Sequence, residues 1–84
     1  MKELECDVYR SPKQEYLYLF VPSSEGMDRV PQELLTQFGE PEKTISFTLS
    51  ADRELARENA ALVMENLQLH GYHLQLPPAD QKFV

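Results

Sequence analysis

The segment Gly71–Pro78, with the sequence Gly-Tyr-His-Leu-Gln-Leu-Pro-Pro, constrains the fold of this chain more than any other. Glycine commonly ends helices, because it adopts left-handed backbone angles without strain. The next five residues alternate between large apolar and polar side chains, which is typical of a half-buried strand. Two prolines then prevent the strand from continuing. The segment therefore predicts a helix end followed by a last strand over residues 72–76, with a core face of Tyr72, Leu74 and Leu76 and an outward face of His73 and Gln75.

The N-terminal part of the chain predicts an antiparallel hairpin. Residues 2–10 alternate between apolar and polar side chains, and residues 16–21 are apolar on both faces. Between them, Ser11–Gln14 is typical of a turn, because Pro12 fixes its own backbone angle. A four-residue turn would pair Arg10 with Glu15. The core face would then hold the pairs Val8–Leu17, Cys6–Leu19 and Leu4–Val21, and the other face Tyr9–Tyr16, Asp7–Tyr18 and Glu5–Phe20.

Two helices and one more strand are expected in the middle of the chain. Pro31 suits the first turn of a short helix that runs to about Phe38 and ends at Gly39. Residues 44–49 alternate as a strand. Ser50 is the expected N-cap of a long helix over residues 51–70. Its apolar side would centre on Leu55, Leu62 and Leu69 and extend over Ala56, Ala60, Val63 and Leu67. Asn59 and Asn66 fall inside this apolar side, so they either form hydrogen bonds within the protein or meet a partner.

The element order is therefore β-β-α-β-α-β, which predicts an α+β fold. We expect one compact domain over residues 1–78, in which an N-terminal antiparallel hairpin belongs to a small mixed sheet with one short and one long helix packed on it. Residues 79–84 are expected to form a flexible tail.

Charge and cysteine content exclude several classes of protein. The net charge of −6 disfavours binding to nucleic acids and to anionic membranes. One local basic cluster is possible, formed by Arg10 and Lys13 and joined by Lys2 or Arg29. The single cysteine, Cys6, cannot form an internal disulfide and is expected to be a small buried apolar residue. With neither a signal-peptide pattern nor a long apolar run, we expect the protein to reside in the cytoplasm.

The sequence contains no recognisable catalytic motif. The three glycines are isolated, one cysteine and two histidines cannot form a usual zinc site, and no serine lies in a nucleophile motif. Ser11 is expected to hydrogen-bond the backbone of its turn, and the carboxylates of Glu3, Glu5 and Asp7 are expected to form a solvated strand face. No cofactor, metal site or catalytic residue is therefore predicted.

The predicted register places aromatic side chains together on the face of the hairpin that is turned away from the core. If this face continues through the later strands, it forms a flat surface with Arg10 and Ser11 at its turn, made of Tyr9, Tyr16, Tyr18, Phe20, His73 and Gln75. Exposed aromatic residues suggest partner binding. The equal alternative is that the short helix covers them with Leu34, Leu35 and Phe38.

Several short motifs resemble the YcgL family of small bacterial proteins. They occur in the family's order and are Cys6-Asp7-Val8-Tyr9-Arg10-Ser11, Tyr16-Leu17-Tyr18, Arg29-Val30-Pro31, Leu34, Phe38-Gly39-Glu40-Pro41 and Gly71–Pro78. The chain departs from the family where His73 replaces a frequent tyrosine and Ala79 a frequent third proline. The resemblance implies a cytoplasmic α/β domain, and it implies no reaction, substrate or cofactor. Packing explains the motif positions Arg10, Ser11, Tyr18 and Gln75 least.

These observations favour a non-catalytic protein-binding module that uses the aromatic face and the Arg10 turn. We expect it to be a monomer or a weak homodimer. The alternative is a small-ligand binder or an enzyme that acts on a polar metabolite through Arg10, Ser11 and nearby carboxylates. Stacking of single-stranded RNA on the aromatic face is a third possibility, which the negative charge disfavours.

Overall fold

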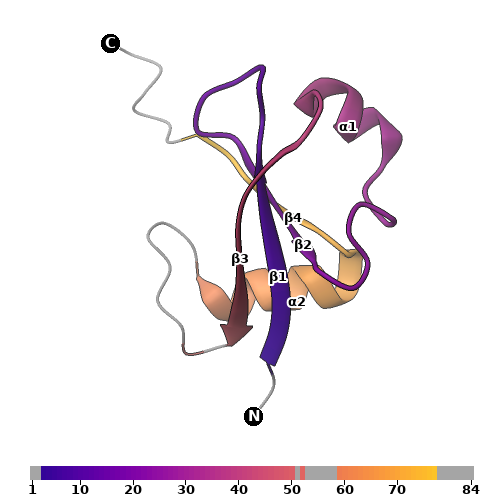
Figure 1. Ribbon diagram of the computed structural model, residues 1–84. Helices are drawn as coiled ribbons and strands as arrows, with labels where there is room; N and C mark the ends of the chain where they lie inside the picture. Colours follow the sequence, from indigo (N-terminus) through magenta and orange to yellow (C-terminus); the bar gives the residue numbers. More distant parts are fainter. Residues whose placement is uncertain (1–2, 51, 53–58, 78–84) are drawn as a thin grey trace.

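The computed structural model describes residues 3–50, 52 and 59–77, which form four strands and two helices (Figure 1). The predicted element order and the α+β fold class are confirmed. The elements are β1 (Glu3–Arg10), β2 (Tyr18–Pro22), α1 (Gln32–Phe38), β3 (Glu42–Ser50), α2 (Ala60–His70) and β4 (His73–Gln75). In the described part of the chain, no helix is both long and apolar enough to cross a membrane. The predicted tail, residues 79–84, lies outside the described residues.

The four strands form one sheet in the order β3-β1-β2-β4. All three neighbouring pairs are antiparallel, so the prediction of a mixed sheet is wrong. The helical connection from β2 to β3 does link two strands that run in the same direction, as expected for a crossover. However, β1 lies between them, and no parallel pair of neighbours results.

The hairpin register differs from the predicted one by three residues. Arg10 pairs with Tyr18 instead of Glu15, and Val8 pairs with Phe20. The cause is a longer loop, closed by a hydrogen bond of 3.0 Å from the amide of Ser11 to the carbonyl of Leu17. Because the shift is an odd number of residues, it moves every side chain of β2 to the other face of the sheet. The predicted core and outer pairs are therefore both wrong.

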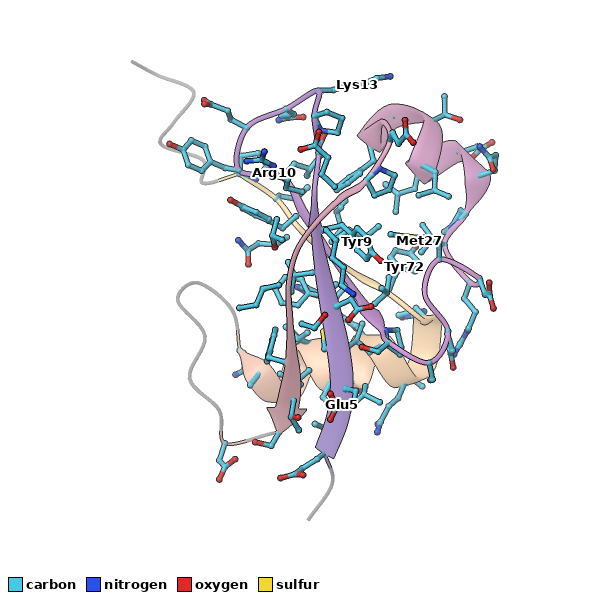
Figure 2. All side chains as sticks on the ribbon, in the orientation of Figure 1. Glu5, Tyr9, Arg10, Lys13, Met27 and Tyr72 are labelled. Carbon is cyan, nitrogen blue, oxygen red and sulfur yellow. The ribbon has the colours of Figure 1, made fainter. Side chains whose placement is uncertain are left out.

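Both faces of the sheet are covered. On one face, α2 packs over a core that includes Cys6, Val8, Phe20 and Leu49. On the other face, Leu19 and Val21 pack with Phe38 of α1 and with the segment between β2 and α1. Figure 2 shows Tyr9 beside Met27 and Tyr72, which belong to this second core.

The predicted aromatic surface is consequently divided between the two faces. Tyr9 lies on the face that α1 covers, together with Leu34, Leu35 and Phe38. Phe20 and Tyr18 lie on the opposite face, where α2 packs. The short helix therefore covers only one of the four aromatic residues of the predicted surface.

Helix α2 begins later than predicted, and only part of its predicted apolar side faces the sheet. Its N-cap is Asn59, whose Oδ1 accepts from the amide of Leu62 at 3.1 Å, whereas Ser50 is the last residue of β3. The predicted centre of the apolar side is wrong where it can be checked, because Leu62 and Leu69 are 49% and 61% exposed, whereas the predicted flanking residues Ala60, Val63 and Leu67 are buried. Leu55 and most of residues 51–58 lie outside the described residues. The buried residues of α2 are Ala60, Val63, Met64 and Leu67.

Asn66 and β4 also differ from a simple inside–outside pattern. The amide of Asn66 lies 2.8 Å from Nδ1 of His73, so both asparagines of α2 form internal hydrogen bonds, the first of the two predicted alternatives. His73, predicted to face outward, is buried against α2, and Leu76, predicted to face the core, is 65% exposed. His73 is buried because both faces of the sheet are covered, so alternation along β4 separates two cores instead of core from solvent. Leu76 lies beyond the last residue of β4, Gln75.

Candidate functional site

One row of side chains crosses all four strands on the α2 face. Arg10 of β1 pairs with Glu42 of β3 and with Tyr18 of β2, and Tyr18 pairs with Gln75 of β4. Directly paired residues project from the same face of a sheet. Arg10 and Glu42 are exposed, while Tyr18 and Gln75 are half-buried. This polar row, Glu42–Arg10–Tyr18–Gln75, is thus a part of the sheet face that α2 leaves open.

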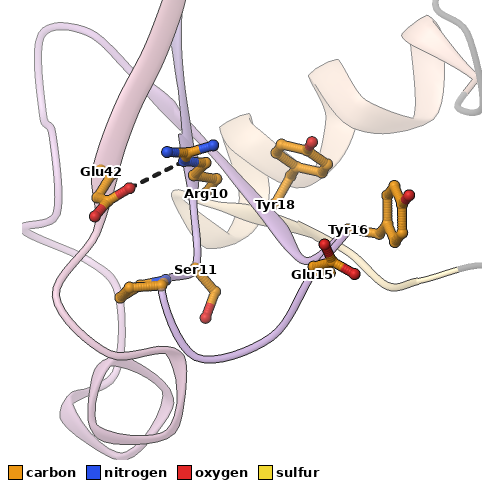
Figure 3. A pocket seen from close by; sticks show the side chains of 7 residues that line it. Arg10, Ser11, Glu15, Tyr16, Tyr18 and Glu42 are labelled. Carbon is orange, nitrogen blue, oxygen red and sulfur yellow. Dashed lines mark hydrogen bonds and ion pairs between the residues drawn. The ribbon is translucent and has the colours of Figure 1, made fainter.

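The loop between β1 and β2 adds a rim to the polar row. The row and the loop line a pocket of about 480 Å³ that is open to solvent (Figure 3). Its lining residues are Arg10, Ser11, Pro12, Glu15, Tyr16, Tyr18 and Glu42. Three kinds of polar side chain, a guanidinium, carboxylates and phenols, therefore face one space.

Arg10 and Glu42 form an ion pair at the end of the row nearest β3. The Arg10 Nε donates to the Glu42 Oε1 at 2.9 Å, and the side chains are 62% and 50% exposed. An ion pair this exposed contributes little to stability, on the order of 0–1 kcal/mol. Its main effect is to fix the direction of the guanidinium across the row.

Ser11 lines the pocket and stabilises the loop between β1 and β2. Its buried hydroxyl donates to the carbonyl of Phe38 and accepts from the amides of Lys13, at 3.0 Å, and Gln14, at 3.2 Å. These bonds match the predicted role of a turn residue. They also occupy the hydroxyl proton and both lone pairs, so the Ser11 hydroxyl is fully engaged in holding the loop.

Tyr16 has an unusual backbone conformation for a residue other than glycine. Its φ is 66°, and the residue is 46% exposed at the pocket rim. A left-handed conformation of this kind costs on the order of 1 kcal/mol, and such residues gather at functional sites. The loop therefore holds an aromatic ring at the pocket edge at some expense to stability.

The eight residues predicted to form a binding surface fall into three groups. Five belong to the pocket or to the polar row, namely Arg10, Ser11, Tyr16, Tyr18 and Gln75. Phe20 and His73 form the next row, where they are buried and meet edge to face with ring centroids 5.7 Å apart. Tyr9 lies on the opposite face of the sheet.

Pro12, Glu15 and Glu42 line the pocket but were not among the predicted site residues. Glu42 reaches the site because β3 is the neighbour of β1, and strand order cannot be read from periodicity. Glu15 was expected in the ladder opposite Arg10, although it lies in the loop. Only a prediction of a longer loop would have placed Glu15 in the site, and no sequence pattern indicates that length.

The predicted basic cluster is not formed by the described residues. Arg10 is paired with Glu42, the Lys13 Nζ donates to the carbonyl of Thr36, and Arg29 donates to the carbonyl of Leu69. Lys2 lies outside the described residues. Each described cation of the predicted cluster thus has a separate partner. Lys13 and Arg29 donate to carbonyls in the last turns of α1 and α2, respectively.

Asp7 was expected to be solvated and is instead buried. Its Oδ1 accepts from the hydroxyls of Ser23 and Ser46, both at 2.7 Å, and the Lys43 Nζ lies 3.6 Å from its Oδ2. Burial raises the pKa of Asp7, but these hydrogen bonds and the lysine charge outweigh it, so the pKa lies below its ordinary value. Asp7 therefore joins β1, β3 and the loop after β2.

Cys6 is fully buried in the α2 core, as predicted. Burial, with the neighbouring Asp7 charge, raises the pKa of its thiol to about 12. Such a thiol is not a nucleophile at neutral pH. Among the described residues, no group of three or more His, Cys, Asp or Glu side chains is arranged to hold a metal ion.

Comparison with known proteins gives consistent matches. The family model of the YcgL domain matches residues 6–78. The YcgL domain-containing proteins of Pseudomonas fluorescens and Pseudomonas savastanoi are 44% and 47% identical over 79 residues. A relative from Pseudomonas entomophila is 46% identical. Each match covers 94% of this chain and 81% of the relative.

Proposed function

The chain belongs to the YcgL domain family, and we propose that it is a non-catalytic protein-binding module that uses the polar row and the pocket above it. One observation carries this proposal. Every strand contributes a side chain to a single row that α2 leaves open, and the loop above it presents Tyr16.

The chemistry of the row suits contact with another protein. Tyrosine and arginine are enriched at the energetic centres of protein interfaces. Here Tyr16, Tyr18 and Arg10 line one pocket, and the exposed Ile45 of β3 belongs to the neighbouring row, opposite Val8. Tyrosine offers a large contact area with few rotatable bonds, so binding orders little flexible structure.

The chemistry also argues against a catalytic use of the pocket. The Ser11 hydroxyl is engaged in the turn, and the Cys6 thiol is buried with a raised pKa. A nucleophile needs an activating base and access to the substrate. Neither candidate has both.

Affinity capture with paired variants tests the proposal. The tagged protein and its Tyr16→Ala/Tyr18→Ala variant are used to capture proteins from lysate of the native host, with Leu69→Ala as the control. Leu69 is 61% exposed on the outer side of α2 and is not a pocket residue. We expect one protein to be retained in near-stoichiometric amount by the wild type and the control, and to be lost with the double variant. If the folded double variant retained the same proteins as the wild type, the proposal would be wrong.

A small polar ligand is the second candidate, favoured by the pocket volume. About 480 Å³ lies within the range of small-molecule sites, roughly 300–1,000 Å³. A ligand that binds only the folded state raises the melting temperature. A thermal-shift screen with polar metabolites therefore tests this candidate, and a hit should disappear in Arg10→Ala. A screen without a stabilising compound would leave protein binding as the better account.

A further inference from the structure

We propose that the pocket receives a cationic side chain of the partner, an arginine or a lysine, between the carboxylate of Glu15 and the rings of Tyr16 and Tyr18. This inference rests on the proposed protein-binding function and specifies the chemistry of the partner. The partner would be a basic segment, because the charges of the pocket and of the whole chain favour one.

The charge of the pocket is unbalanced. Its charged lining residues are Arg10, Glu15 and Glu42, and the Nε of Arg10 is already bonded to Glu42 at 2.9 Å. Glu15 forms neither an ion pair nor a side-chain hydrogen bond within the described part of the chain. One carboxylate therefore faces the pocket without a counterion from the protein, and a cation is the complementary ligand.

The two tyrosine rings provide a second attraction for a cation. Figure 3 shows the rings of Tyr16 and Tyr18 standing clear of the backbone, with the Glu15 side chain beside Tyr16. A cation placed over an aromatic face gains on the order of 0.5–1 kcal/mol at an exposed site, and arginine stacks best. The left-handed backbone at Tyr16 holds that ring at the rim.

The charge of the whole molecule acts in the same direction. The net charge of −6 repels acidic partners and steers basic ones toward the surface. Lys13 and Arg29, the described cations of the predicted basic cluster outside the pocket, donate to helix carbonyls. Of this cluster's described cations, Arg10 alone lines the pocket, and it is already paired with Glu42.

Titration with three short peptides tests this inference on the full-length protein. The probes are Ac-Gly-Arg-Gly-NH₂ and its glutamate and norleucine counterparts, followed by amide chemical shifts in ¹⁵N-labelled protein. We expect the arginine peptide to shift the amides of residues 10–18, with weaker binding at higher salt, and the other two to leave them unchanged. Glu15→Gln should weaken arginine-peptide binding about two- to fivefold, as expected for one exposed ion pair. Glu65→Gln, the same change on the outer side of α2, should leave it unchanged.

Failure of this inference can be distinguished from failure of the proposed function. If the glutamate peptide bound and the arginine peptide did not, Arg10 would be the recognition group, and the inference would be overturned. If no peptide shifted these amides while affinity capture still depended on Tyr16 and Tyr18, protein binding would stand without a cationic anchor. Equal effects of Glu15→Gln and Glu65→Gln would also contradict the inference, since the attraction would then come from the overall charge.

Discussion

Gly71 is the residue at which a single methyl group should disturb the fold most. Its φ is +86°, and its amide donates to the carbonyl of Leu67 at 3.0 Å to close the last turn of α2. A Cβ at this position would lie 2.5 Å from the Cβ of Arg29, whose guanidinium donates to the carbonyl of Leu69. Glycine is therefore required both for the backbone angle and for the close approach of Arg29.

Replacement of Gly71 by alanine should lower the free energy of unfolding by more than about 2 kcal/mol, because strain and overlap add. Gly26→Ala is the matched control: Gly26 also has a positive φ, +57°, but no atom lies within 4 Å of the place that an added methyl group would take. The control should cost about 1 kcal/mol, the backbone contribution alone. Urea denaturation of both variants measures the difference, and equal losses would show that the Arg29 contact is unimportant.

Asp7 should make the stability of the protein depend on acid pH. Its pKa in the folded protein lies below the ordinary value, so its contribution is complete above the unfolded pKa, about 3.9. The contribution is lost as the pH falls through that value and then through the folded pKa. Asp7→Asn, which replaces the carboxylate that accepts from two serines, should cost about 1–2 kcal/mol at pH 7.

The difference between wild type and Asp7→Asn should therefore shrink as the pH falls from about 5 toward 2. Urea unfolding at several pH values measures it. The exposed Glu40, changed to glutamine, serves as the control. A difference that stayed constant over this range would mean that the Asp7 charge does not contribute.

At the scale of elements, the orientation of α2 provides a direct test of the packing. The sequence pattern predicted a core side centred on Leu62 and extending to Leu67, whereas the helix buries Leu67 and leaves Leu62 49% exposed. Leu67→Ala should cost about 2–5 kcal/mol, because it leaves a cavity between α2 and the sheet. Leu62→Ala should change the free energy of unfolding by less than about 1 kcal/mol. Denaturant midpoints distinguish the two, and a larger loss at Leu62 would contradict the helix orientation.

The elements themselves could be predicted from the sequence, while their pairing could not. Gly39 and Gly71 marked the ends of both helices, alternation identified β1, β3 and β4, and a short apolar run identified β2. The hairpin register depended on the length of one loop, where the bonds accepted by the Ser11 hydroxyl and the left-handed Tyr16 lengthen the turn. Neither feature has a pattern in the sequence. The resulting error of three residues in the hairpin register assigned every side chain of β2 to the wrong face of the sheet.

Only part of the candidate site could be predicted, because its residues come together through the pairing of the strands. Arg10, Tyr18 and Gln75 were three of the four positions that packing explained least, with Ser11, and the structure brings these three into one row. Glu42 could be placed in the row only once the strand order was known, and strand order is a property of the whole sheet. The grouping of Tyr9 with the other aromatics followed from the wrong register and could not be corrected from the sequence.

At the scale of the whole molecule, coverage of both sheet faces leaves a small, defined opening. One helix packs on each face, and four of the five residues of β2 are buried. A fold of this kind needs both helices in place to cover a short central strand that is apolar on both sides. The polar row is open because α2 packs on the rows of the same sheet face that contain Phe20 and Leu49.

Site-specific photo-crosslinking in the native host tests protein binding through the polar row most directly. A photoreactive phenylalanine analogue replaces Tyr16 in the pocket or, as the control, Gln37 of α1, a residue of the groove between α1 and β4 on the opposite face. We predict one discrete crosslinked protein from position 16, absent from position 37 and abolished when Tyr18→Ala is added. The same crosslinked products from both positions, or none from position 16 in the folded protein, would contradict binding through this row.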